Sequence, residues 1–200
     1  LWDRYKLRDL STWYGRFAKG NQDFSALFVY SCPEAYLGEN GRIGFVVTQT
    51  LFQAVAHGSL TPGEDVGFRR FKLSKSFIRV ERVDDFTSMK PFEGAQNRTA
   101  TFVAAKGVQS TEFPVDYYVW TIQPGVDLGA LATWAEFEAV AKANPLRAVP
   151  IRNSSGPWVV LPKSVDVGVV HKMSSGRPGY RAWRGTDTRG ANSIFWFHLN

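Results

Sequence analysis

The sequence predicts an α/β fold, and three consecutive segments near its start indicate it. Residues 23–37 carry apolar side chains at helical spacing, and a turn between Gly38 and Gly41 ends this helix. The next segment, RIGFVVT at 42–48, is an almost continuous apolar run of strand length, which is typical of a strand covered by helices on both faces. A helix, a tight turn and a buried strand in succession form a unit of α/β folds.

Four shorter segments extend this pattern. Residues 51–57 and 65–73 have helical patterns, and the breaker Thr61-Pro62-Gly63 separates them. Residues 77–83 and 99–105 predict two strands. A loop of about fifteen residues joins these strands, and loops of that length inside a compact domain tend to be functional.

The chain after residue 110 has a different character. Residues 113–122 predict a strand, and residues 133–143 predict an amphipathic helix with Trp134, Phe137 and Val140 facing inward. From Asn144 onward Pro, Gly, Ser and Arg dominate, and only SIFWFHL near the end predicts a further strand. We therefore expect a boundary between two regions near residue 110.

Composition limits the class of protein. With 200 residues and 44% hydrophobic content, the chain can bury a core. It has one cysteine and no cluster of Cys and His at metal-site spacing, so we expect neither an internal disulfide nor a metal site. No apolar run approaches ~20 residues and no signal peptide is recognised, so we expect a cytoplasmic protein without a membrane span.

Positive charge is concentrated in the last third of the chain. Residues 142–200 hold nine lysines and arginines against two aspartates, a net charge of +7, while the whole chain carries +6. This imbalance favours a polyanion as the partner of that region. The alternative is a basic surface that is merely solvated.

Two stretches resemble a known enzyme family. They are DFSALFVYSCPEAYLGENGRIGFVVTQTLF from Asp23 and DFTSMKPFEGAQNRTATFVAAKG from Asp85, and both are similar to the carboxyl-terminal half of N6-adenine DNA methyltransferases of restriction-modification systems. The resemblance implies the class I S-adenosylmethionine-dependent fold, with residues 1–110 as the second half of the methyltransferase domain and antiparallel last strands. Residues 111–200 would be a β-rich basic extension that begins the target-recognition region.

The resemblance also implies roles for single residues. Phe92, on the long loop, would stack on the target adenine, because a base flipped out of a duplex needs a flat surface. Phe28 would pack on the adenine ring of S-adenosylmethionine. The alternative for Phe92 is a cover over the core, and for Phe28 an ordinary core position. Five basic residues are expected to contact DNA phosphates: Lys90, Arg98, Arg181, Arg184 and Arg189.

Two parts of such an enzyme are missing from the sequence. It has no Gly-rich cofactor loop and no Asn-Pro-Pro-aromatic motif, since Asn144-Pro145-Leu146 lacks the second proline and the aromatic. We therefore expect a fragment whose parent uses S-adenosylmethionine, without a metal, to methylate adenine in double-stranded DNA. The fragment would be inactive without the remainder of its polypeptide and would not bind the cofactor tightly. The alternatives are a non-catalytic DNA-recognition module, and an RNA-binding or protein-interaction domain.

Overall fold

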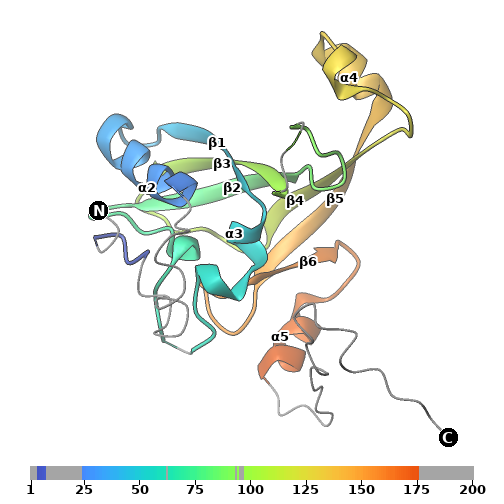
Figure 1. Cartoon of the computed structure of the whole chain (residues 1–200). Coiled ribbons are helices and arrows are strands. Elements are labelled where there is room, and N and C mark those ends of the chain that lie inside the picture. The colour runs from blue at the N-terminus through green and yellow to red at the C-terminus, as the bar shows by residue number, and fades with distance from the viewer. Residues whose placement is uncertain (1–3, 8–23, 62, 93, 95–96, 176–200) are drawn as a thin grey trace, which may run out of the picture.

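A computed structural model describes residues 4–7, 24–61, 63–92, 94 and 97–175 of the chain. Within these residues the fold is α/β, as predicted, with one mixed, open sheet in the order β1-β3-β2-β4-β5-β6 (Figure 1). Strands β2 and β4 are parallel, and the other neighbouring pairs are antiparallel. The strands are β1 (Arg42–Thr48), β2 (Phe77–Asp85), β3 (Thr99–Gly107), β4 (Val115–Ile122), β5 (Ala141–Pro150) and β6 (Trp158–Pro162).

Helix α2 (Phe24–Tyr36) confirms the helix predicted ahead of β1. Lys106 of β3 donates from Nζ to the carbonyls of Pro33 (2.9 Å) and Leu37 (2.6 Å) at the end of this helix, and the Pro33 carbonyl also accepts from the Leu37 N–H (3.2 Å). Asn40 then adopts a left-handed conformation with φ 59°, which asparagine tolerates, and the chain turns into β1. The inner side of α2 buries four residues: Ala26, Val29, Tyr30 and Pro33.

One face of the sheet, the covered face, carries the core. On it Phe102 of β3 lies between Phe45 of β1 and Val83 of β2. Phe52 and Phe68 pack edge-on against Phe102, with ring-centroid distances of 5.8 and 6.5 Å. These two rings belong to the short helices that cover this face: α3 (Thr50–Gln53), η1 (Val55–His57) and η2 (Phe68–Arg70).

The helix predicted over 65–73 is wrong in extent. Only η2 forms, as a single 3-10 turn, because Gly67 before it (φ 85°) and Phe71 after it (φ 47°) adopt positive φ angles through which a helix cannot continue. The predicted helix over 51–57 is divided into α3 and η1 by the extended residue Ala54.

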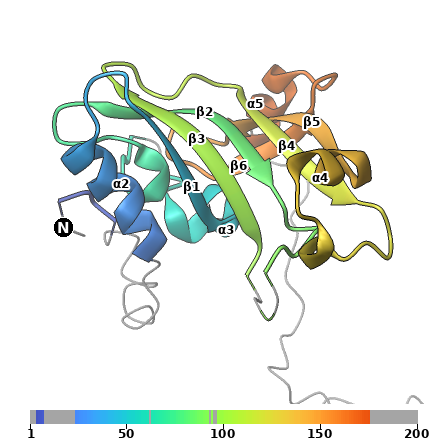
Figure 2. The same cartoon turned by 90° about the horizontal axis from the view of Figure 1, so that it is seen from above.

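The opposite face, the open face, contradicts the prediction that helices cover β1 on both sides. Val46 of β1 is 53% exposed, and Val103 of β3 is 38% exposed. Among the described strands, β1 has a neighbour on its β3 side only. Figure 1 shows α3 below the strands and no described helix above β1 to β3, and Figure 2 looks down on this face. Within the described part of the chain, the apolar run of β1 therefore buries one side.

The chain after β3 adds three strands to the same sheet. The predicted helix forms as α4 (Trp134–Val140), and it is shorter than expected because Ala141 already begins β5. A capping box between Thr133 and Glu136 fixes its start. Trp134, predicted to face inward, is 62% exposed. The sequence does not predict β5 and β6, because prolines within and after β5 disfavour a strand; helix α5 (Val167–Ser175) follows β6.

The expected boundary near residue 110 lies within one continuous sheet. Residues on both sides of it belong to a single buried cluster. Arg69 is buried, and its guanidinium donates to the carbonyls of Leu51 and Ala54 (both 2.8 Å) and of Ser155 (3.1 Å). It thereby connects α3 to the turn between β5 and β6. The division into two regions stays a prediction.

Candidate functional site

The long loop that the sequence predicts to be functional connects β2 to β3 and spans residues 86–98. Its base closes where the Phe86 N–H donates to the Thr99 carbonyl (2.9 Å). The Phe86 carbonyl then accepts from the N–H groups of Met89 (2.9 Å) and Lys90 (3.2 Å). Lys90 has a left-handed φ of 48° directly before Pro91, a conformation that costs about 1–2 kcal/mol. Such strain persists where surrounding contacts hold it, as these hydrogen bonds do.

Phe92 lies on the outer part of this loop and is 52% exposed. About half of the ring surface is therefore accessible for stacking. Lys90 and Arg98 are exposed on the same loop. The Arg98 carbonyl accepts from the Gln49 N–H (2.8 Å), which ties the end of the loop to the residue after β1. The structure thus places Phe92, Lys90 and Arg98 on the same loop, and their roles toward DNA stay predictions.

A buried polar network supports the root of the loop from the covered face. Asp85, the last residue of β2, accepts from the Tyr117 hydroxyl (2.7 Å) and from the Thr87 N–H (2.9 Å). Gln49 Nε2 lies 3.4 Å from the Tyr117 hydroxyl oxygen. Burial, and next the hydrogen bond to Asp85, raise the pKa of Tyr117 above its ordinary value, so the hydroxyl stays a neutral donor. The network fixes the first residues of the loop.

A second set of contacts lies on the open face. Asp84 accepts two hydrogen bonds from the Arg82 guanidinium (2.6 and 2.8 Å) and one from the indole N–H of Trp120 (2.7 Å). The same guanidinium lies 4.1 Å from the ring centroid of Tyr118. Asp84 and Asp85 point to opposite faces, as alternation along a strand predicts, so they do not form a carboxylate pair.

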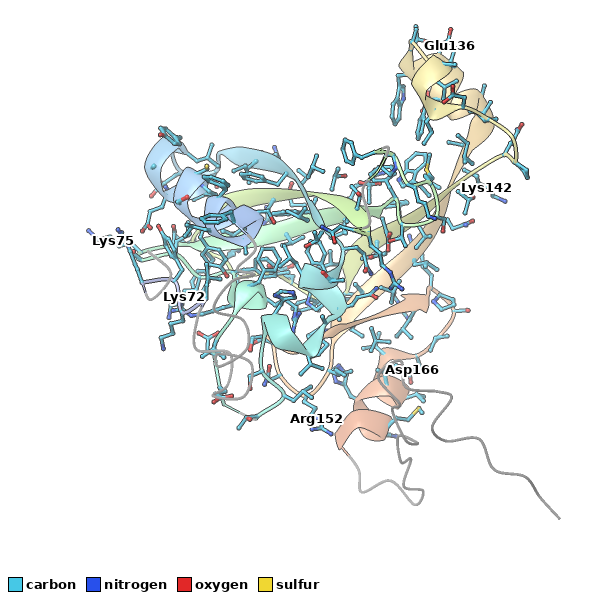
Figure 3. All side chains as sticks on the ribbon, viewed as in Figure 1. Lys72, Lys75, Glu136, Lys142, Arg152 and Asp166 are labelled. Carbon is cyan, nitrogen blue, oxygen red and sulfur yellow. The ribbon has the colours of Figure 1, made fainter. Side chains whose placement is uncertain are left out.

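Four aromatic rings, called here the aromatic cluster, connect the root of the loop to α4: Phe86, Trp120, Phe137 and Trp134. Phe86 stacks on Trp120 with centroids 6.0 Å apart and planes at 20°. Trp120 contacts Phe137 (5.4 Å), and Phe137 stacks on Trp134 (5.0 Å). Figure 3 shows Glu136 of α4 far from the sheet and Lys142 of β5 nearer to it. The cluster thus bridges two elements on one side of the sheet.

The other predicted site residues are not part of this loop. Phe28 lies on α2 and is 51% exposed, so it is not the core residue that the alternative required. Its role toward a cofactor stays a prediction. Arg181, Arg184 and Arg189 lie outside the described residues.

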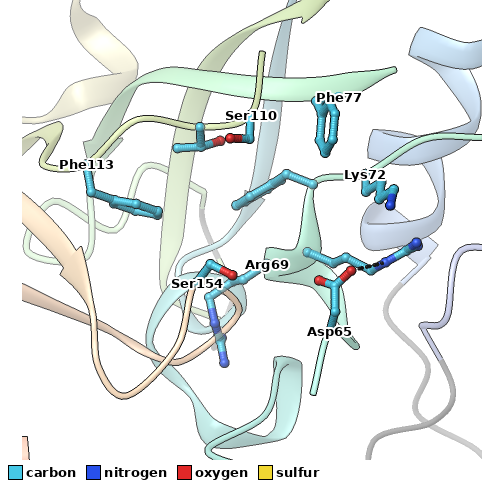
Figure 4. Close-up of a pocket in the computed structure, with 10 residues that line it drawn as sticks. Asp65, Arg69, Lys72, Phe77, Ser110, Phe113 and Ser154 are labelled. Carbon is cyan, nitrogen blue, oxygen red and sulfur yellow. Dashed lines mark hydrogen bonds and ion pairs between the residues drawn. The ribbon is translucent and has the colours of Figure 1, made fainter. Parts of the chain in front are cut away.

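A separate pocket of about 230 Å³ lies at the far end of the sheet from the loop, beside Phe77 at the start of β2 (Figure 4). Arg70 in its wall pairs with Asp65 at 3.0 Å. The Thr111 hydroxyl accepts from the Val80 N–H (3.0 Å) and donates to a β2 carbonyl. These polar groups already have partners within the chain, and none of them faces the loop.

Sequence reasoning missed the supports of the loop. The aromatic cluster and the Asp85 network depend on the parallel pairing of β2 with β4, for which the sequence has no turn signal. The sequence carries only local signals of these supports: two acids end a predicted strand immediately before the loop, and a Trp lies near the end of the strand predicted over 113–122.

The described part of the chain holds neither a candidate metal site nor a candidate membrane span. No cluster of His, Cys, Asp or Glu that could hold a metal ion occurs in the described part of the chain. No helix among the described residues is both long and apolar enough to cross a bilayer. No protein-family model and no curated protein sequence matches the chain.

Proposed function

We propose that this chain is the base-receiving part of an N6-adenine DNA methyltransferase, and that the cofactor-binding part belongs to other residues of the same enzyme. The observation that carries the proposal is the strand order β1-β3-β2 with both pairs antiparallel. β3 returns between two strands that run parallel to each other. This arrangement agrees with the antiparallel last strands of the sheet that the sequence resemblance implies.

The loop after β2 supports the same function. It presents the half-exposed ring of Phe92 at one end of the sheet, and the exposed basic residues Lys90 and Arg98 lie on the same loop. Stacking on such a ring contributes roughly 1–3 kcal/mol per base. Lysine and arginine beside it suit the phosphates that flank a flipped nucleotide.

Among the described strands, β1 has no neighbour on one side, and this is where the remaining part of the proposed enzyme would join the sheet. In the proposed enzyme further strands continue the sheet from β1, and helices that connect those strands cover the apolar residues Val46 and Val103 of the open face. Phe28 lies on α2, the helix that precedes this strand, and its exposed ring is available to pack on an adenine.

The proposed reaction is a direct transfer of the methyl group that S-adenosylmethionine supplies to the amino nitrogen of adenine. Residues outside this chain orient that nitrogen. Within the chain, Phe92 holds the base by stacking, while Lys90 and Arg98 contact the phosphates beside it. Direct transfer forms no covalent intermediate with the protein.

The test uses the longer protein, expressed in a host without adenine methylation, with N6-methyladenine in total DNA quantified by mass spectrometry. We expect methylation in the wild type and a loss of about tenfold to a hundredfold in rate for Phe92→Ala, with Phe92→Trp retaining more activity. Tyr36→Ala is the matched control, since Tyr36 is an 83% exposed aromatic beside the start of β1, at the other end of the sheet. Absence of N6-methyladenine, or an unchanged rate per folded molecule in Phe92→Ala, would contradict the proposal.

A further inference from the structure

We propose that the arm formed by residues 123–140, with α4 at its tip, positions the Phe92 loop through the aromatic cluster. The inference rests on the function proposed above for its role in base capture. The observation behind it is a contact between two regions that are separate in the sequence: the loop between β2 and β3, and the arm between β4 and β5.

The strand pairing brings the arm beside the loop. β4 runs parallel to β2, and Val119 pairs with Asp85, the last residue of β2. The next residue of each strand is therefore a neighbour of the other, and these residues are Trp120 and Phe86. Their rings stack on one another. β4 then continues past the end of β2 and pairs with β5 as far as Ile122 and Ala141, which carries α4 beyond the sheet (Figure 1).

Phe86 connects the aromatic cluster to the turn at the start of the loop. Its ring belongs to the aromatic cluster, and its carbonyl accepts from the N–H groups of Met89 and Lys90. The same turn holds Lys90 in its left-handed conformation, two residues before Phe92. Trp120 is itself oriented, since its indole N–H donates to Asp84. A displaced cluster would therefore release the turn from which Phe92 projects.

The charge of the arm favours positioning over contact with the DNA backbone. Residues 123–140 contain three acids, Asp127, Glu136 and Glu138, and no lysine or arginine. An acidic arm repels phosphates, so we expect the arm to contact the Phe92 loop through its aromatic rings and not to contact the DNA backbone. Trp134 is 62% exposed, and its removal therefore tests the arm without emptying the core.

The first experiment measures amide hydrogen exchange of Met89 and Lys90 in this chain. Trp134→Ala and Phe137→Ala each remove two ring contacts of the cluster, and they are expected to speed that exchange by at least about two- to tenfold, the factor that the loss of one aromatic pair predicts. Exchange of core amides in β3 should stay unchanged, and Trp134→Phe should restore protection. Tyr36→Ala, a matched exposed aromatic away from the cluster, should have no effect. Unchanged exchange at Met89 and Lys90 in both cluster variants would overturn the inference.

The second experiment separates this inference from the proposed function. In the longer enzyme, Trp134→Ala should lower the methylation rate by about two- to tenfold at an unchanged thermal midpoint, and Trp134→Phe should recover it. If the wild type methylates DNA and Phe92→Ala is impaired while Trp134→Ala is not, the arm has no positioning role and the proposed function stands. If the wild type does not methylate DNA, the proposed function fails. Faster exchange at Met89 and Lys90 in the cluster variants would still support the inference that the arm positions the loop.

Discussion

Asp85 lies on the covered face of the sheet and is 6% exposed, whereas Asp84, one residue earlier, lies on the open face beside Arg82 and Trp120. On the covered face each polar group needs a partner, because an unpaired buried donor or acceptor costs about 1–3 kcal/mol. On the open face, the Arg82 side chain is 44% exposed although that of Asp84 is only 13% exposed, so solvent partly screens their ion pair, and such pairs contribute up to about 1 kcal/mol. The covered face therefore contributes more to stability, whereas the open face leaves Val46 of β1 and Val103 of β3 exposed and buries Trp120 beside α4.

The largest effect is expected at Arg69 on the covered face. Arg69→Ala removes a buried guanidinium and leaves the carbonyls of Leu51, Ala54 and Ser155 without this donor. We expect a loss of about 3–5 kcal/mol in the free energy of unfolding, measured by urea denaturation. Arg79→Ala, which breaks a half-exposed pair with Glu81, is the control and should cost less than about 1 kcal/mol. Similar losses in the two variants would remove the distinction between the faces.

The two neighbouring acids give the most direct comparison. Asp85→Asn weakens the hydrogen bonds from Tyr117 and Thr87 inside the core, and we expect it to lower the free energy of unfolding by about 2–3 kcal/mol. Asp84→Asn weakens the pair with Arg82 and should cost about 0–1 kcal/mol. Both are measured by denaturant unfolding under the same conditions. A larger loss for Asp84→Asn would reverse the assignment of the two faces.

The buried hydroxyl of Tyr117 should make the free energy of unfolding depend on pH in the alkaline range. Its pKa is raised above the ordinary value of 10.0, so above pH 10 the unfolded chain releases this proton while the folded chain keeps it. The stabilisation is therefore complete below that pH and is lost above it, by about 1.4 kcal/mol per pH unit. Burial lowers the pKa of Arg69 to about 9, an effect of opposite sign that is common to wild type and Tyr117→Phe. Unfolding curves at pH 8 and above pH 10 should show a shallower decline for Tyr117→Phe, and equal slopes would contradict a buried neutral hydroxyl.

The smallest effect on stability is expected at Phe92. Because its ring is half exposed, Phe92→Ala should change the free energy of unfolding by no more than about 0.5 kcal/mol. Phe102→Ala on the covered face, where the ring is fully buried, should cost about 3–5 kcal/mol. A thermal melt of both variants checks this. A large loss for Phe92→Ala would make its ring part of the core.

The sequence predicted those helices and strands that are encoded by the spacing of apolar residues over a short segment. Helix α2, β1, β2 and β3 follow from apolar spacing over a few residues, and the exposed position of Phe92 follows from a long loop between two predicted strands. The supports of that loop could not be predicted, because Asp85 meets Tyr117 across 32 residues and only through parallel pairing. Arg69 meets Ser155 across 86 residues, and an arginine in a basic turn gives no sign that it will be buried.

The edge of β1 that no described strand pairs has a practical consequence for handling the chain. Soluble proteins protect exposed sheet edges with charges, prolines or bulges, since an edge of unpaired N–H and C=O groups can recruit another strand. RIGFVVT carries one charged residue, Arg42, at its start and no proline. When the chain is concentrated in isolation, this strand is where edge-to-edge association and precipitation would begin. A lysine in place of the exposed Val46 is the smallest change that would oppose it.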